Sequence, residues 1–274
     1  MRTLLTLFMI LLIQLNAVSQ PVPIVRGLQF TEGPAIDKQG NLYFSDVKAQ
    51  QIYVYTRNKG HHLFLDNTGG ANGLYFDKQG NLIACAGKAR KLVLITPSRE
   101  IKTLVDSYGG KKLNSPNDLW IDPKGGIYFT DPRYGNANDL EQDGMHVYFF
   151  IPRDSNLIRV TKDLVRPNGI VGSPDGKLLY VVDQGAQKTY RYQILPDRSL
   201  TGKVLFANVG TDGMTIDSKG NIYITHQKTV QCFAPDQKLL NTITFDAMTT
   251  NVVFYKKQLF VTTQAGEVFQ INLN

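Results

Sequence analysis

Polar residues with oxygen-bearing side chains recur at matched positions along this chain. They are Glu32, Asn72, Asn117, Asn168, Asp212 and Asn251. Each stands nine to twelve residues before the central apolar residue of a repeated phrase, and each opens an apolar run such as NDLWI or DGMTI. If the repeats are related by rotation, matched positions lie on one circle and their side chains face a common centre.

Carboxylates and amides gathered against an apolar interior would repel one another and lack partners unless a cation joined them. Oxygen ligands favour Ca²⁺, with Mg²⁺, Mn²⁺ or Zn²⁺ as alternatives. Asn and Asp side chains also form hydrogen bonds with turns at strand starts. For Asn72 and Asn251, this structural role is as good an explanation as a position in a pocket. It does not explain a long carboxylate at position 32. We therefore predict one divalent cation near Glu32, Asn117, Asn168 and Asp212.

The repeated phrase predicts the elements that hold these residues. Its copies read DKQGNLYFSD, DKQGNLIACA, DPKGGIYFTD, SPDGKLLYVVD, DSKGNIYITH and YKKQLFVTT. Asp-x-x-Gly is turn chemistry, and the Tyr, Phe, Val and Ile that follow favour strands, so each copy predicts a β-hairpin. Six copies about 37 to 50 residues apart match the spacing of four-stranded propeller blades.

Further strand-like runs follow each hairpin, two after each of the first five copies and one after the sixth. The last blade therefore lacks an outer strand, and the segment PIVRGL near the N-terminus is the candidate to complete it. We predict an all-β, six-bladed β-propeller of four-stranded antiparallel blades over residues 20–274, closed by its N-terminal strand. Closure in this way removes an exposed sheet edge.

Residues 1–19 have the features of a secretory signal, with Arg2, an apolar run and small residues near a cleavage point. We expect an exported protein, periplasmic or secreted, with no membrane association after signal removal and a monomeric state. The net charge is +7, but the basic residues form no run, so nucleic acid is not an expected partner. Cys85 and Cys232 fall in different predicted blades and are expected to be buried thiols.

Four segments carry a resemblance to a known family. They are EGPAID, LNSPNDLWIDPKGGIYFTDPRYG, LVRPNGIVGSPDGKLLYVVD and DGMTIDSKGNIYIT, and they resemble the signature segments of the senescence-marker-protein/gluconolactonase family of six-bladed propellers. The likeness implies a metal-dependent hydrolase that opens a sugar or other small lactone. It implies that Glu32, Asn168 and Asp212 bind the cation, that Asn117 contacts the metal or substrate, and that Asp212 moves protons.

Two departures from the family pattern concern the pocket. Animal members have an arginine where this chain has Ser115, and many bacterial relatives read Cys-Glu-His-Gly where this chain reads CAGK from Cys85.

Other residues are weaker candidates for the site. Asn72, Arg133 in the long polar insertion, and His226 at a hairpin end are expected to contact substrate, although a loop arginine is often simply exposed. Asp46, Asp131 and Asp183 occupy the position of His226 in other repeats and either face the channel or cap turns. The alternative function is a non-catalytic exported propeller that binds a ligand or protein and contains a structural Ca²⁺.

Overall fold

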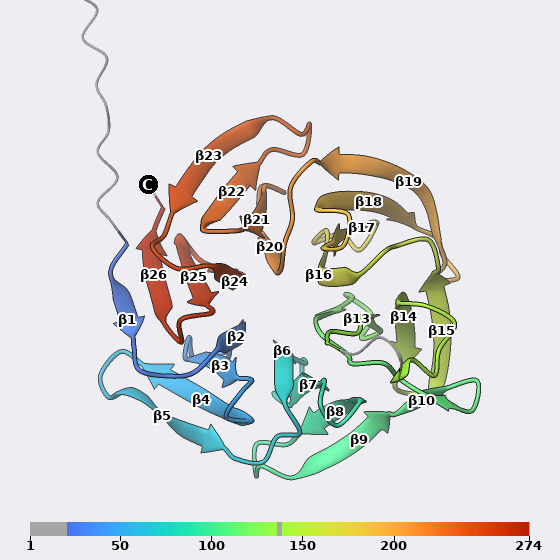
Figure 1. Ribbon diagram of the computed structural model, residues 1–274, viewed down its shortest axis with the longest axis horizontal. Helices are drawn as coiled ribbons and strands as arrows, with labels where there is room; N and C mark the ends of the chain where they lie inside the picture. Colours follow the sequence, from blue (N-terminus) through green and yellow to red (C-terminus); the bar gives the residue numbers. More distant parts are fainter. Residues whose placement is uncertain (1–20, 136–138, 274) are drawn as a thin grey trace, which may run out of the picture.

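The computed structural model describes residues 21–135 and 139–273, and within these ranges the regular elements are β-strands, with no α-helix. The predicted signal at 1–19 lies outside the described residues. No helix in the described part of the chain is long and apolar enough to cross a membrane. Six four-stranded antiparallel sheets surround a central axis, which confirms the predicted six-bladed propeller (Figure 1).

In the first five blades, four strands run in chain order from the axis outward. Blade 1 contains β2 (Thr31–Ile36), β3 (Leu42–Asp46), β4 (Gln51–Thr56) and β5 (Gly60–Leu65). Blade 2 contains β6 (Ala71–Phe76), β7 (Leu82–Ala86), β8 (Lys91–Ile95) and β9 (Ile101–Val105). Blade 3 contains β12 (Leu119–Ile121), β13 (Ile127–Asp131), β14 (His146–Ile151) and β15 (Asn156–Thr161).

The remaining blades repeat this order. Blade 4 contains β16 (Pro167–Gly172), β17 (Leu178–Asp183), β18 (Lys188–Ile194) and β19 (Leu200–Ala207). Blade 5 contains β20 (Met214–Ile216), β21 (Ile222–His226), β22 (Thr229–Phe233) and β23 (Leu239–Thr244). Blade 6 contains β24 (Thr249–Tyr255), β25 (Gln258–Thr263) and β26 (Val268–Asn272). A small hairpin, β10 (Ser107–Tyr108) with β11 (Lys111–Lys112), precedes blade 3.

The N-terminal strand β1 (Pro23–Val25) completes blade 6, as predicted. It pairs antiparallel with β26, Pro23 opposite Phe269 and Val25 opposite Val268. The first and last segments of the chain therefore share one sheet, and the ring closes through backbone hydrogen bonds.

Apolar side chains fill the space between neighbouring blades. Tyr128, Phe149 and Tyr180 are almost fully buried between blades 3 and 4, and Trp120 stacks on Tyr128 with ring centroids 5.8 Å apart. Burial of one large apolar side chain stabilises a fold by about 1.5–3 kcal/mol, so the blade contacts hold the ring rigid. Cys85 on β7 and Cys232 on β22 are buried free thiols in different blades, as predicted.

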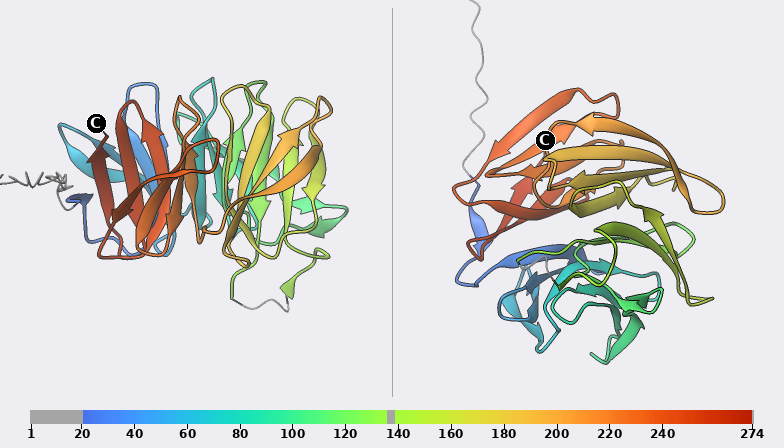
Figure 2. Two further views of the ribbon diagram at one scale, coloured as in Figure 1. Left: turned by 90° about the horizontal axis from the view of Figure 1, so that it is seen from above. Right: turned by 45° about the vertical axis from the view of Figure 1, so that its right-hand side comes forward.

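The direction of the inner strands determines where a site can form. In every blade the innermost strand starts at the same end of the ring and runs to a hairpin at the other end. The loops before the innermost strands, and the turns between the second and third strands, therefore gather around the start of those strands. The longest such connection joins β13 to β14, and its described parts, residues 132–135 and 139–145, protrude from that end of the ring in the side view of Figure 2.

Candidate functional site

A cavity of about 680 Å³ opens at the end of the ring where the innermost strands start. The six polar residues at matched positions of the repeats are called the ring residues below. Five of them line this cavity: Glu32, Asn72, Asn117, Asn168 and Asp212. Backbone irregularities turn these side chains toward the axis. Glu32, Asn72 and Asn168 lie at register shifts of β2, β6 and β16, and bulges of this kind redirect a side chain. Asn117 and Asp212 lie just before β12 and β20.

Glycines let the innermost strands approach one another at the axis. Gly33 follows Glu32 and has φ +45°, and a Cβ there would lie 2.0 Å from the backbone oxygen of Asn72. Gly213 follows Asp212, and a Cβ there would lie 2.0 Å from Oδ1 of Asn251. Both contacts are too short for any side chain, so the close approach of the ring residues requires glycine at these positions.

Burial and mutual repulsion disfavour the charged forms of the two carboxylates. Glu32 is 2 % exposed, and burial raises its pKa to about 7. Burial also raises the pKa of Asp212 well above its usual value, and the nearby charge of Glu32 raises it further. Such a pair binds a proton or a cation more readily than a solvated pair does, because either one relieves the repulsion.

The amide oxygens of the site also lack partners. Oδ1 of Asn72 and Oδ1 of Asn168 are buried, and neither accepts a hydrogen bond within the described residues. An unsatisfied buried acceptor costs about 1–3 kcal/mol. Two carboxylates and two free amide oxygens around one cavity match the ligand set that hard divalent cations prefer. The residues present therefore fit a bound cation.

Tyr134 is a site residue that the sequence analysis missed. Its hydroxyl oxygen accepts a hydrogen bond of 2.6 Å from Nδ2 of Asn168, and the guanidinium of Arg166 lies 5.4 Å from the ring centroid. Because Nδ2 is engaged by Tyr134, the other end of the Asn168 amide, Oδ1, is the free end. The aromatic residue after Arg133 in the insertion was the only signal for this role in the sequence.

Asn251, the sixth ring residue, lies deeper and does not line the cavity. Its Nδ2 donates to Oδ2 of Asp118 at 3.2 Å, and its Oδ1 accepts a hydrogen bond of 2.8 Å from the backbone N–H of Val252. Burial and the charge of Glu32 raise the pKa of Asp118 to about 8. Asp118 was also missed. It occupies the position after the ring residue where four other repeats have glycine, and that departure was visible in the sequence.

The aspartates at the hairpin ends hold the loops that lead into the innermost strands. Asp46 accepts hydrogen bonds from the backbone N–H groups of Gln29 and Phe30, Asp131 from those of Asn114 and Ser115, and Asp183 from those of Val165 and Arg166. In each case the two donors stand three and two residues before the ring residue. The sequence left two roles open for these aspartates, facing the channel or capping turns, and in the structure they cap turns.

His226 occupies the same position in blade 5 and does not line the cavity. Its Nδ1 accepts a long hydrogen bond of 3.4 Å from the backbone N–H of Gly210, two residues before Asp212. The structure therefore places His226 in the loop-holding role and not against the site. The adjacent Gln227 lines the cavity instead.

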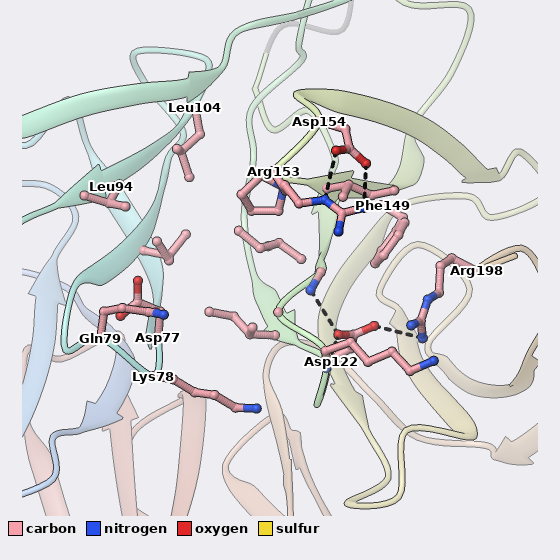
Figure 3. Close-up of a pocket in the computed structure, with 18 residues that line it drawn as sticks. Asp77, Lys78, Gln79, Leu94, Leu104, Asp122, Phe149, Arg153, Asp154 and Arg198 are labelled. Atoms are coloured by element: carbon pink, nitrogen blue, oxygen red, sulfur yellow. Dashed lines mark hydrogen bonds and ion pairs between the residues drawn. The ribbon is translucent and has the colours of Figure 1, made fainter. Parts of the chain in front are cut away.

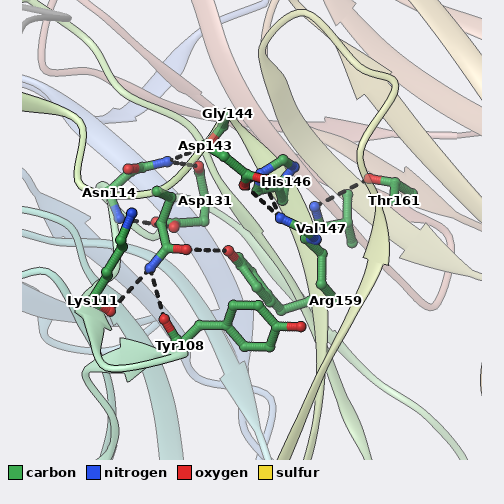
Figure 4. Close-up of polar contacts among 12 residues, drawn as sticks. Tyr108, Lys111, Asn114, Asp131, Asp143, Gly144, His146, Val147, Arg159 and Thr161 are labelled. Atoms are coloured by element: carbon green, nitrogen blue, oxygen red, sulfur yellow. Dashed lines mark hydrogen bonds and ion pairs between the residues drawn. The ribbon is translucent and has the colours of Figure 1, made fainter.

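Arg133 does not line the cavity either. Its guanidinium pairs with Asp139 and donates to the backbone oxygen of Asn114 at 3.3 Å. Figure 4 shows the contacts that hold the far end of the same insertion. Nδ2 of Asn114 donates to the backbone oxygen of Gly144 at 2.9 Å. Oδ1 of Asp143 forms hydrogen bonds with Nε2 of His146 and with the guanidinium of Arg159. These contacts fix both ends of the insertion, and Tyr134 rather than Arg133 reaches the cavity.

A separate cavity of about 570 Å³ lies at the opposite end, between blades 2 and 3 (Figure 3). Its three lining carboxylates already have partners: Asp122 pairs with Arg198 and Asp154 with Arg153, each at 3.0 Å, and Asp77 accepts hydrogen bonds of 2.8 Å from the backbone N–H and from Nδ2 of Asn81. Leu94, Leu104 and other apolar side chains form much of its wall. It offers no cluster of free oxygen ligands among its lining residues, so the cavity that contains Glu32 and Asp212 is the stronger candidate site.

Comparisons with known proteins identify relatives over most of the chain. A gluconolactonase from Zymomonas mobilis is 30 % identical over 82 % of this chain and 73 % of its own length. The solved structure of a gluconolactonase from Xanthomonas campestris superimposes with a TM-score of 0.86 at 30 % identity, covering 92 % of this chain and 88 % of that one. A calcium-binding regucalcin from Agrobacterium tumefaciens, with a TM-score of 0.78 and 17 % identity over 92 % of this chain and 93 % of its own, shares the fold.

The family model for the SMP-30/gluconolactonase/LRE-like region matches residues 30–265, a range that contains every ring residue described above. Together with the Zymomonas relative, this match is decisive, and the chain belongs to the SMP-30/gluconolactonase/LRE-like family.

Proposed function

We propose that this protein is a metal-dependent lactonase that hydrolyses the ester bond of a small cyclic lactone. The observation that carries the proposal is the convergence of Glu32, Asp212 and two unpartnered amide oxygens on one open cavity. The gluconolactonase relatives support lactone hydrolysis as the reaction class. Metal dependence and the choice of Ca²⁺ are our inference from the chemistry of these side chains.

Glu32, Asn168 and Asp212 would hold the cation, with Asn117 and Asn72 beside it. When bound, a divalent cation supplies Lewis acidity that polarises an ester carbonyl. Asp212 accepts a proton at its carboxylate from an attacking water and returns one to the departing ring oxygen. Burial raises the pKa of Asp212 above its usual value, which makes its carboxylate a stronger proton acceptor than a solvated aspartate.

The rest of the cavity would orient the substrate. Glutamine and threonine side chains around its rim offer hydrogen-bond donors and acceptors to a hydroxylated ring: Gln184, Gln187, Gln227, Gln264, Thr211 and Thr249. Phe30 and Met248 offer apolar contact. Such a mixed lining binds a small polar ring in one orientation.

A metal panel tests the proposal. The mature chain is stripped with chelator, restored with Ca²⁺, Mg²⁺, Mn²⁺ or Zn²⁺ singly, and assayed on glucono-1,5-lactone and other aldonolactones. We expect loss of turnover on stripping and its return with at least one metal, Ca²⁺ first. Tight metal binding without turnover of any lactone would instead support the alternative, a ligand-binding propeller with a structural cation.

A further inference from the structure

We propose that a second cavity beside the site receives an anionic substituent of the substrate, so that lactones bearing a carboxylate or phosphate are preferred over neutral ones. The inference rests on the proposed lactonase function and names its substrate class. It is drawn from the shape and charge of the second cavity.

The two cavities are neighbours with a shared wall. The second has a volume of about 370 Å³ and shares five lining residues with the first: Val47, Lys48, Asn72, Asn117 and Tyr134. Tyr134 is fixed between them by its bond to Asn168. A ligand whose reacting group lies near Asn117 therefore has space for a substituent on the other side of Tyr134.

The charged side chains that line the second cavity are Lys48 and Lys88, with no carboxylate among the lining residues. Neither lysine forms an ion pair with any carboxylate within residues 21–135 and 139–273. The Lys48 ammonium lies 5.5 Å from the ring centroid of Phe30, which lines the main cavity. Two unpaired cations at one concave surface create a local positive potential that attracts an anion.

The backbone that carries Lys88 is held in place. The N–H of Gly87 donates to the backbone oxygen of Gly70 at 3.0 Å, and the N–H of Ala89 donates to that of Gly69 at 2.9 Å. Ser115, which replaces the arginine of the animal pattern, donates from Oγ to the backbone oxygen of Gly87 at 3.1 Å. The backbone that carries the lysine is therefore already ordered, so no loop-ordering entropy is lost when the ammonium binds an anion.

Two matched substrate pairs test the proposal on the metal-loaded protein. D-Glucaro-1,4-lactone and D-glucono-1,4-lactone differ in having a carboxylate or a hydroxymethyl group at C6. 6-Phosphoglucono-1,5-lactone and glucono-1,5-lactone separate phosphate from carboxylate as the anionic group. We expect kcat/KM to be higher for the anionic member of at least one pair, and the preference to weaken as NaCl is raised.

Variants locate the preference. Lys48→Gln with Lys88→Gln should lower the anionic-to-neutral ratio of kcat/KM about tenfold, since each exposed charge pair contributes modestly. Lys228→Gln is the matched control, because Lys228 lies in the corresponding turn of blade 5 and lines neither cavity. An equal ratio in the wild type, or a ratio that the double substitution leaves unchanged, would overturn the proposal.

A binding measurement distinguishes failure of this proposal from failure of the lactonase proposal. If no lactone is turned over, calorimetric titration of the metal-loaded protein with each lactone pair still reports whether the anionic member binds more tightly. Tighter anionic binding that disappears in the double variant would support the second cavity even for a protein without lactonase activity. Equal binding of both members would reject it.

Discussion

At the scale of single residues, the two site carboxylates differ in their surroundings. Both line the cavity, but Glu32 is buried and accepts a backbone hydrogen bond from Gly33 at 2.9 Å, whereas Asp212 is only half-buried. This difference assigns the proton-moving role to Asp212 and the anchoring role to Glu32 in our proposal.

Asp212→Asn should retain the fold and lose lactonase activity about 10²–10⁴-fold, the usual contribution of a positioned general base. The measurement is kcat at saturating metal, with thermal unfolding to check the fold. Asp236→Asn, an exposed carboxylate in a turn at the opposite end, is the control and should keep full activity. Unchanged kcat in Asp212→Asn would remove this residue from the chemistry.

The hydroxyl of Tyr134 should matter for metal affinity, because it orients the Asn168 amide. Tyr134→Phe removes one hydrogen bond worth about 0.5–1.5 kcal/mol, so we expect the dissociation constant for the cation to rise about three- to tenfold. Calorimetric titration of the stripped protein measures it. Tyr190→Phe, on the outer part of blade 4, provides the comparison, and equal constants for the two variants would contradict an orienting role.

At the scale of elements, the hairpin-end aspartates of blades 1, 3 and 4 connect the second strand to the loop that positions a ring residue. Asp183→Ala removes the acceptor of the partly buried hydrogen bonds from the N–H groups of Val165 and Arg166, and each such bond contributes about 0.5–1.5 kcal/mol. We expect that loss in the free energy of unfolding, together with weaker metal binding through displacement of Asn168. Denaturant unfolding and metal titration measure the two effects.

Asp246→Ala is the matched control, because its carboxylate is exposed and accepts no hydrogen bond recorded within the described residues. A stability loss in Asp183→Ala without any change in metal affinity would show that the loop holds its position by other contacts.

The elements were predictable because each hairpin carries its own turn and strand chemistry. The phrase DKQGNLYFSD contains the Asp and Gly of the turn that follows β2 and the residues of β3, so six copies predict six hairpins, and hence six blades, without reference to distant contacts. The ring residues followed from the same periodicity, since matched positions in a rotationally repeated fold face the axis.

Contacts between repeats were not predictable in this way. Arg133 and Tyr134 are adjacent in one loop, and only the fold shows that Arg133 pairs with Asp139 while Tyr134 reaches Asn168 in the next blade. The carboxylate of Asp118 meets Asn251, which is 133 residues away in sequence. Such pairings depend on how blades pack, and a single repeat contains no information on them.

At the scale of the whole molecule, ring closure depends on the short strand β1. Val25 is 2 % exposed and belongs to an apolar cluster between blades 6 and 1, whereas the nearby Val22 is 71 % exposed. Val25→Ala should lower the free energy of unfolding by about 1 kcal/mol or more through lost burial, and Val22→Ala should have almost no effect. Removal of residues 1–27 should destabilise the whole ring, as a large fall in the unfolding midpoint. Equal stability of the truncated and full-length proteins would contradict closure by β1.

Stability of the whole molecule should also depend on pH through its buried carboxyls. Burial raises the pKa of Glu32 and Asp131 to about 7 and that of Asp118 to about 8, and it also raises that of Asp212. These pKa values lie above the ordinary values of 4.5 for Glu and 3.8 for Asp. At any pH between the ordinary and the raised pKa, the folded state therefore binds more protons than the unfolded state. The stability that these groups contribute is therefore present at low pH and is lost as pH rises from about 5 to 8 in chelator-treated protein.

A bound cation should reverse this dependence, because it replaces protons as the partner of Glu32 and Asp212. We expect the unfolding midpoint in chelator to fall by several degrees between pH 5 and pH 8, and the increase on adding CaCl₂ to be larger at pH 8 than at pH 5. Thermal unfolding at four pH values, with chelator or with Ca²⁺, measures both. Glu32→Gln should flatten the chelator curve, since one of the titrating groups is removed. A Ca²⁺ effect of the same size at pH 5 and pH 8 would mean that these carboxylates do not exchange protons for the cation.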